Sequence, residues 1–304
     1  MRLLRRLAAA IGVIWLAATL AFFALRVLPG DAIQGQLLGS GASSSAIADR
    51  RAALGLDDPA LTQYGRWIAG LGQGNLGVSL LDGQPVAAMI GQRLAPTVAL
   101  ALSALLVAVA LGITLGGIAG LERGAGSRLA ALLLDLALSM PIYWTGTLAI
   151  WLFAVQLGWL PFSQSSDLSG LILPALVLGF HSAGAIGRVF SAGVREAKDA
   201  DFVRAARAKG LPERAVLSRH IARASLLSAI TVIALQAGFL LSGIVITESL
   251  FVRPGIGRLL LDSVLRQDYP VVQGIVVWMA LVYTAVNAAA ELIYTLVDPR
   301  VSAR

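Results

Sequence analysis

The sequence contains no cysteine and only two histidines, His181 and His220, among its 304 residues. The missing thiols exclude disulfide bonds, a thiolate nucleophile and cysteine-based zinc or iron–sulfur sites, and two histidines are too few for a histidine-rich metal site. The sequence also lacks the Gly-x-x-x-x-Gly-Lys-Ser/Thr phosphate loop and the Gly-x-Ser-x-Gly nucleophile elbow. Any dependence on ATP must therefore come from a partner that carries such a loop.

Charged residues are scarce as well. They make up 13% of the chain, while 57% of it is hydrophobic and the mean hydropathy is +0.79. Ordinary globular proteins have about 25% charged residues, and so few charges could not cover a soluble fold. The net charge of +7 is distributed over several short segments, which argues against a nucleic-acid interface. The composition predicts a multi-pass membrane protein.

Six stretches are long and apolar enough to cross the hydrocarbon core, which takes about 20 residues of helix: 7–27, 97–119, 129–156, 171–192, 225–247 and 271–296. They contain four charged residues, Arg26, Asp135, Arg188 and Glu291. The first three lie near span ends, where long side chains can reach the interface. We therefore expect an all-α transmembrane fold with six spanning helices.

Basic residues are distributed unevenly between the segments that flank these spans. If the N-terminus is cytoplasmic, the segments on that side hold 16 of the 24 basic residues, so the positive-inside rule predicts that both termini are cytoplasmic. The arginine-rich opening also fits a cleavable signal peptide. However, the apolar run continues to Arg26 without a small-x-small cleavage site, and we favour a retained first helix.

The expected organisation has an N-terminal transmembrane helix, an extracytoplasmic insertion, and a five-helix core with a cytoplasmic loop at 195–224; the three parts cover residues 1–28, 29–96 and 97–304. The insertion contains a Ser/Gly-rich stretch at 39–45 that predicts a flexible loop.

A short helix is expected in the insertion after Asp58 and Pro59. Its apolar side, formed by Leu61, Tyr64 and Ile68, could lie on the membrane, cover the mouth of a pore or pack onto its own domain.

The cytoplasmic loop predicts two short helices joined at a fixed corner. Asp199 or Asp201 can cap the first helix, Gly210 suits a left-handed C-cap, and Pro212 can open the second helix.

Phe202 and Ala206 lie one turn apart in the first of these helices, which predicts a small apolar knob with basic side chains around it. Such a knob suits a socket on another protein. A basic loop that only enforces orientation, or that contacts anionic lipid, explains the same composition.

Polar side chains inside the spans are candidates for a translocation path, although Gln and Asn can equally bond neighbouring helices together: Asp135, Tyr143, His181, Gln236, Asn287 and Glu291. Glycines at 112, 116 and 120 form a stripe that lets another helix approach closely. The pattern leaves open whether that helix belongs to this chain or to a second subunit.

The loop sequences DFVRAARAKGL at 201–211 and RHIARAS at 219–225 resemble the cytoplasmic-loop signature of ABC importer permeases. This chain has Arg204 where the general pattern Glu-Ala-Ala-x-x-x-Gly has Glu. In that departure the chain is similar to the dipeptide/oligopeptide/nickel branch of these permeases. Other motifs in the same order and spacing resemble the first permease subunit of that branch, including Leu-Gly-x-Ser at 76–79 and Asp-Tyr-Pro-Val-Val-Gln at 268–273.

This resemblance implies a type I ABC importer permease fold in a prokaryotic inner membrane. It implies a second homologous permease subunit, two ATP-binding subunits and an extracytoplasmic substrate-binding protein as partners, with lipid around the spans and no nucleic acid. ATP and Mg would be bound by the partners, and this chain would bind no cofactor. Di- or oligopeptides are the favoured substrates, with nickel or metal–opine complexes as the alternative.

The resemblance also assigns residues to roles, none of them catalytic or metal-binding. The residues expected to couple the chain to an ATPase are Asp201, Phe202, Val203, Arg204, Ala205, Ala206, Arg207, Lys209 and Gly210. A second set is expected along the translocation path, partly because of its place in the spans and partly because of the resemblance. It consists of Tyr143, Gln236, Glu248, Pro254, Gly255 and Asn287. The loop at 248–270 is expected to dip toward this path.

Two readings from other classes remain open at this point. The chain could be an ion-coupled secondary transporter that uses Asp135 or Glu291 as the titrating group. An intramembrane hydrolase built on Ser182 and His181 is disfavoured, because neighbours in a helix point about 100° apart.

Overall fold

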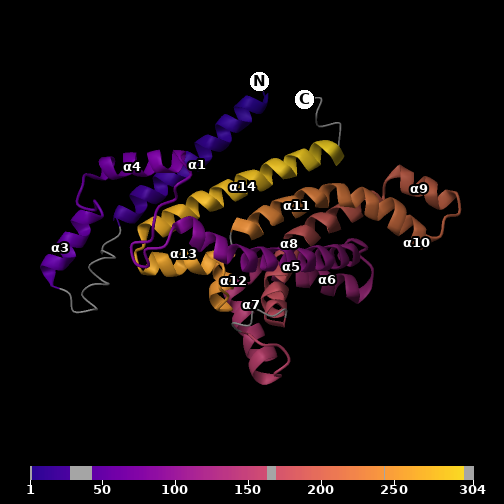
Figure 1. Ribbon diagram of the computed structural model, residues 1–304. Helices are drawn as coiled ribbons and strands as arrows, with labels where there is room; N and C mark the ends of the chain where they lie inside the picture. The colour runs from indigo at the N-terminus through magenta and orange to yellow at the C-terminus, as the bar shows by residue number, and fades with distance from the viewer. Residues whose placement is uncertain (1, 28–42, 163–168, 243, 298–304) are drawn as a thin grey trace. The chain divides into compact units, whose positions relative to one another are not determined.

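The structure is a computed structural model that describes residues 2–27, 43–162, 169–242 and 244–297 (Figure 1). In these ranges the chain is helical and contains no named strand. It divides into two compact units, residues 1–95 with 254–284 and residues 96–253 with 285–304. The division falls inside two long helices, α5 (Val86–Gly120) and α14 (Tyr269–Val297). The predicted all-α fold is confirmed.

The first unit contains the beginnings of α5 and α14 together with α1 (Arg2–Val27), α3 (Ser44–Ala53), α4 (Ala60–Gly72) and α13 (Ile256–Leu265). Its main hydrophobic cluster joins α13 to the starts of α5 and α14 and consists of Val86, Ile90, Ile256, Leu259, Val271 and Ile275. The segment after residue 254 therefore packs with the N-terminal part of the chain.

Aromatic side chains fasten α4 to α1. Trp67 stacks on Phe22 with ring centroids 5.5 Å apart, and the Tyr64 hydroxyl lies 2.8 Å from the hydroxyl of Thr19. Leu61 stays 74% exposed, so it does not share the packed side. Of the three alternatives for this helix, the structure shows packing onto its own unit.

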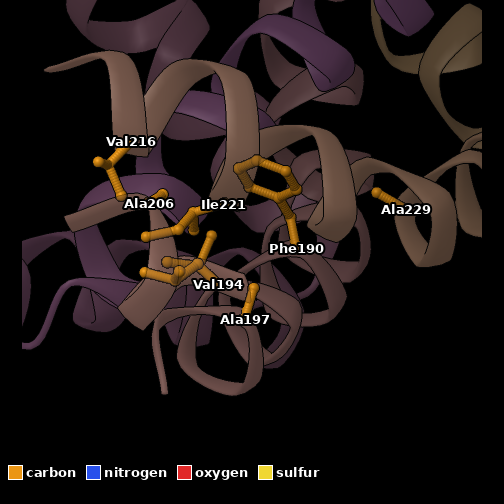
Figure 2. Packing of buried hydrophobic residues seen from close by; sticks show 8 residues of the cluster. Phe190, Val194, Ala197, Ala206, Val216, Ile221 and Ala229 are labelled. Carbon is orange, nitrogen blue, oxygen red and sulfur yellow. The ribbon is translucent and has the colours of Figure 1, made fainter. Parts of the chain in front are cut away.

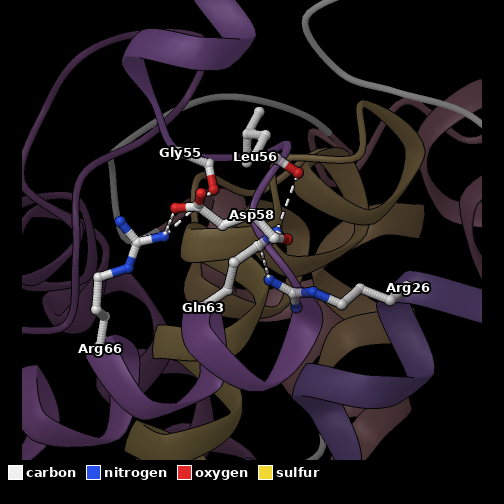
Figure 3. Close-up of polar contacts among 6 residues, drawn as sticks. All are labelled: Arg26, Gly55, Leu56, Asp58, Gln63 and Arg66. Carbon is white, nitrogen blue, oxygen red and sulfur yellow. Dashed lines mark hydrogen bonds and ion pairs between the residues drawn. The ribbon is translucent and has the colours of Figure 1, made fainter.

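Polar contacts connect the end of α1 to the link between α3 and α4, as Figure 3 shows. Arg26 donates to the side-chain oxygen of Gln63 at 2.6 Å, and the Gln63 amide donates to the carbonyl of Leu56 at 3.0 Å. Asp58 forms an ion pair with Arg66. The helix is capped by Pro59 without a side-chain hydrogen bond, so Asp58 acts as an ion-pair partner and does not cap α4.

A buried carboxylate joins the two motifs at 76–79 and 268–273. Asp268 accepts hydrogen bonds from the hydroxyl of Ser79 and, at 3.0 Å, from the backbone N–H of Leu80. Both Asp268 and Ser79 are less than 5% exposed. Because a buried carboxylate needs such partners, these motif residues have a structural role in the first unit.

The flexible loop predicted at 39–45 is wrong at its end. Residues 39–42 lie outside the described residues, but α3 begins at Ser44, and the Ser43 hydroxyl accepts a hydrogen bond from the N–H of Ala46 at 3.3 Å. Serine is a good N-cap, and this local signal prevails over the loop-like composition.

The second unit contains the remainder of α5 and α14 and the elements α6 (Gly124–Ser139), α7 (Ile142–Ala149), the π-helix η1 (Ile150–Gln156), α8 (Ser169–Lys198), α9 (Asp201–Ala208), α10 (Glu213–Ala215), the π-helix η2 (Val216–Ile221), α11 (Ala222–Ser242) and α12 (Val245–Leu250). Helix α8 is its centre. Within its most apolar stretch 67% is buried, against at most 33% for the other spanning helices.

Five helices are long and apolar enough to span a membrane, and the pair α6 and α7–η1 makes a sixth span if it is counted as one. The count of six agrees with the sequence, but the continuous helix expected at 129–156 is wrong. The pair is bent by 112° at its break. Pro141 forces Met140 into an extended conformation (φ −80°, ψ 136°), so the helix ends there and α7 starts anew.

Glycines let α8 touch its neighbours backbone to backbone. A Cβ atom at Gly116 of α5 would lie 2.6 Å from the carbonyl oxygen of Gly187 in α8, and one at Gly120 would lie 2.6 Å from the Val194 Cβ. On the α6 side, a Cβ at Gly187 would lie 2.4 Å from the Leu134 side chain. The glycine stripe of α5 therefore packs against a helix of the same chain.

We predict that Gly116→Ala destabilises the protein by about 1–3 kcal/mol, because the added methyl group meets the backbone of α8 and not a side chain that can turn away. The measurement is thermal unfolding of the purified chain in detergent. Gly91→Ala is the control in the same helix, since nothing lies within 4 Å of a Cβ there. Equal unfolding midpoints for the two variants would contradict the packing described.

Candidate docking site at the α9 corner

Helix α9 is held by its inner side. Val203 is 0% and Ala206 5% exposed, and both belong to a hydrophobic cluster with residues of α8 and η2 (Figure 2): Phe190, Val194, Ala197, Val216, Ile221 and, from α11, Ala229. Because the two residues are three positions apart, they lie on one side of the helix. Their burial fixes α9 against the end of α8.

The predicted knob of Phe202 and Ala206 is therefore wrong. Ala206 faces inward, while Phe202 is 47% exposed; Val203, which was expected in the docking surface, is also buried. The outer surface of α9 and its corner consists of the remaining predicted coupling residues, all exposed: Asp201, Phe202, Arg204, Ala205, Arg207, Lys209 and Gly210. Phe202 is the one large apolar side chain among them.

The corner after α9 is closed by backbone hydrogen bonds. Leu211 N–H donates to the carbonyl of Ala206 at 3.3 Å and Gly210 N–H to that of Arg207 at 3.0 Å, the two bonds of a Schellman motif. Gly210 has φ +76°, a left-handed conformation that a side chain would disfavour. Pro212 then caps α10. The corner predicted from Gly210 and Pro212 is present.

Charged pairs fix the outer side of the corner. Arg207 makes two hydrogen bonds to Glu213, at 2.9 and 3.2 Å, and the bond to Glu213 raises the pKa of Arg207. Arg204 pairs with Asp201 at 2.8 Å. Helix α9 starts after Ala200, with no side-chain cap, so the expected cap by an aspartate is wrong; Asp201 instead neutralises a neighbouring cation.

The sequence did not indicate how the end of α8 is held in place before α9 begins. Glu122, which lies between α5 and α6 and has φ +53°, accepts a hydrogen bond from Lys198 and lies 4.0 Å from Arg195. The bond from Lys198 lowers the pKa of Glu122. Because 76 residues separate Glu122 from Lys198, no local pattern could reveal the pair.

The residues predicted along a translocation path lie in different surroundings. In the second unit, Tyr143 of α7 is 57% exposed, whereas Gln236 of α11 and Asn287 of α14 are partly buried. In the first unit, Pro254 is exposed and Gly255 is the buried N-cap of α13. Most of the loop expected to dip toward a path is helical, because α12 and α13 occupy much of it.

The prediction that Glu248 lines a path is wrong for this structure. Its side chain is 0% exposed and accepts a hydrogen bond of 2.6 Å from the Thr97 hydroxyl. Arg253 nearby donates to the carbonyl of Gly170 at 3.0 Å, and burial lowers the pKa of Arg253 while the charge of Glu248 opposes that shift. The carboxylate has a hydrogen-bond partner inside the second unit, where it joins α12 to the part of α5 that begins at residue 96.

A cavity of about 340 Å³ opens in the first unit, beside the contacts of Figure 3, and its lining includes Arg26, Gln63, Trp67, Asn75 and Gln273. Within the described residues, the indole N–H of Trp67 and the side-chain amide nitrogen of Gln273 have no hydrogen-bond partner. No three His, Asp or Glu side chains of the described ranges come together as a metal site.

Two family models match the chain. Residues 112–303 match the family described as binding-protein-dependent transport system inner membrane component, and residues 1–101 match the N-terminal region of such membrane components. The first match alone covers more than half of the chain and includes α8, α9 and the corner. The transmembrane helices are thus those of a multi-pass permease component.

Full-length relatives agree. The chain is 38% identical to a protein described as a peptide transport system permease of Brucella suis, over 98% of both chains. It is 34% identical to the glutathione transport system permease protein GsiC of Escherichia coli, over 98% of this chain and 97% of the relative.

A crystal structure titled as an amino acid ABC transporter with histidines matches the fold, with a TM-score of 0.53 and 15% identity over 70% of this chain and 94% of the other. That likeness supports the expected type I permease fold. The family matches and the relatives together show that the chain belongs to the binding-protein-dependent transport system inner membrane components, the permease subunits of ABC importers.

Proposed function

We propose that this chain is the permease subunit of an ABC importer for short peptides. Separate ATP-binding subunits dock on the α9 corner, a second homologous permease pairs with this one, and a binding protein delivers the substrate. The peptide assignment comes from relatives named for peptide and glutathione transport. ATP and Mg belong to the partner subunits, since this sequence has no phosphate loop.

One observation carries the proposed docking: α9 is anchored by Val203 and Ala206 but leaves Phe202 47% exposed. A loop that served only to carry positive charge would need neither the buried anchor nor the closed corner at Gly210. A rigid short helix with one projecting aromatic side chain fits an apolar cleft on a partner, and such aromatic residues often dominate binding energy.

By the positive-inside rule, the basic residues around α9 support a cytoplasmic location for the corner and both termini. The insertion after the first span, which the same rule puts on the outer side, offers the docking region for a binding protein. ATP binding at the partners shifts the permease between inward-open and outward-open states. Moving such an equilibrium from 1:99 to 99:1 takes about 5.5 kcal/mol of differential binding.

We predict that Phe202→Asp lowers peptide-stimulated ATPase activity and uptake at least about tenfold, because it puts a charge where the proposed cleft is apolar. The side chain lies outside the buried cluster, so insertion and unfolding temperature should stay unchanged. The assay uses the complex purified through a tag on this chain and reconstituted in liposomes, with labelled trialanine as probe.

Two control variants separate docking from general disturbance. Phe202→Leu keeps an apolar side chain and should retain most activity, and Ser218→Asp puts the same charge on an exposed position of η2 and should have little effect. Normal uptake by the Phe202→Asp complex would refute the docking assignment.

The energy source distinguishes this proposal from an ion-coupled transporter that titrates Asp135. We predict that trialanine uptake by the reconstituted complex needs ATP and its hydrolysis and is insensitive to a protonophore or sodium ionophore. Removal of the ATP-binding subunits should abolish uptake. Uptake that persists without them and collapses with the ion gradient would favour the secondary transporter.

A further inference from the structure

Helix α8 is buried on most sides but leaves one narrow strip uncovered in its second half. The strip follows the spacing of one helix face, four and three residues apart. Along its centre lie the partly buried or exposed residues His181, Ala185, Arg188, Ala192 and Arg195, and Val189, Gly193 and Glu196 beside them are not buried either. In the first half of the helix the uncovered residues Ile172 and Leu176 are apolar. The strip is thus polar only in the half that leads to α9.

An ion pair lies in the middle of this strip. Arg188 contacts Asp135 of α6 at 2.8 Å, and the two side chains are 59% and 53% exposed. At 1.5 Å per residue, Arg188 lies about 15 Å from the end of α8 and Asp135 about 16 Å from the start of α6. Arg188 is thus about two to three turns inside α8, whereas Asp135 lies about one turn before Ser139, where α6 ends at the break that precedes α7.

The pair has polar neighbours along the same strip. Two turns away in α8, the Nε2 atom of His181 lies 2.6 Å from the hydroxyl of Thr145 in α7. Two turns in the other direction, Arg195 lies 4.0 Å from Glu122. Alanines separate these side chains, so the strip is shallow as well as polar. Polar contacts thus recur about every two turns along this side of α8.

Lipid is an unfavourable neighbour for this strip. Ionised side chains inside a span almost always face a water-filled cavity or the interior of a bundle. Arg188 could extend toward the interface, but the short side chain of Asp135 cannot, and the pair holds the two together. A water-filled path satisfies the exposed halves of both charges.

We propose that this strip lines the half of the translocation path next to α9, and that the Asp135–Arg188 pair contacts the ionised groups of the passing solute. The identity of the solute rests on the proposed function, whereas the position of the path does not. A guanidinium binds a carboxylate in bidentate fashion, and a carboxylate attracts an ammonium group. The pair thus suits solutes that carry both charges, as short peptides do.

The path is tested first by cysteine labelling, for which the natural absence of cysteine leaves this chain free of other thiols. Ala185→Cys keeps the ion pair, and Leu129→Cys is the control, an apolar residue of α6 that is 57% exposed. The complex in lipid nanodiscs is treated with a membrane-impermeant cationic methanethiosulfonate, and labelling is followed on this subunit.

We expect Cys at 185 to react at least about tenfold faster than Cys at 129, since only the former faces water. If depth in the membrane alone set the labelling rate, Cys at 129 would react faster, because Leu129 is nearer to the end of its helix. Ala192→Cys provides a second variant on the strip if the first does not assemble. Equally slow labelling at both strip positions, whether lipid or a second permease covers them, would overturn the path.

The contact with solute is tested by changing the charges. The double variant Asp135→Arg with Arg188→Asp keeps a pair, so the complex should assemble, and it is the control for each single variant. We expect Arg188→Asp alone, which leaves two carboxylates, to raise the uptake ratio of trilysine to triglutamate at least about fivefold, and Asp135→Arg alone to lower it by a similar factor, while the double variant stays near the ratio of the unaltered complex. An unchanged ratio in active complexes of the single variants would overturn the solute contact and leave a pair that only joins α6 to α8.

The two experiments separate this inference from the proposed function. Labelling needs neither ATP nor a substrate, so fast reaction at position 185 supports the path even if no peptide is taken up. Loss of uptake in every variant, including the unaltered complex, would count against the peptide assignment alone.

Discussion

The close approach of helix backbones along α8 is the constraint on which the second unit depends. Glycines on α5 and α8 leave no room for a Cβ atom at their contacts, so dispersion and weak backbone contacts replace the side-chain packing of a soluble core. In a membrane the helices gain little from leaving lipid, and close contact between small residues is what holds them. The positions of the elements that pack on α8 follow from these glycine contacts.

Three contacts connect α8 to the α9 corner and fix its position. Glu122 and Lys198 hold the end of α8 at the loop after α5, the buried side of α9 packs onto α8 and η2, and the hydrogen bonds around Gly210 set the angle to α10. Each contact uses a different interaction, an ion pair, apolar burial and backbone geometry. A short helix of eight residues would be marginal alone, and these contacts make it a fixed feature.

Local signals were sufficient to predict the spans, the family motifs and the corner, because each depends on the composition or order of adjacent residues. Gly210 and Pro212 have conformational preferences that hold in any context. Other features needed partners distant in sequence. The side of α9 that is buried depends on Val216 and Ile221, and the pairing of Asp135 with Arg188 depends on how α6 meets α8.

Two errors have more specific causes. The break at Pro141 was hidden inside an apolar run, where hydropathy counts residues but not the lost N–H of a proline. Glu248 was expected along the path because the family resemblance implies that the loop at 248–270 dips toward it. Its partner Thr97 lies 151 positions away, and only the fold shows that the charge is enclosed.

The π-helix η2 connects the corner to α11 and has a consequence for variation in length. A π turn holds an extra residue compared with an α turn, so the six residues of η2 store a local surplus of chain. Loss of one residue there would relax the segment to an ordinary α-helix and leave the rotation of α11 about its axis almost unchanged, because five residues of α-helix turn the chain about as far as six of π-helix. Homologues that lack a single residue between positions 216 and 221 would therefore still present the same face of α11 to the rest of the bundle.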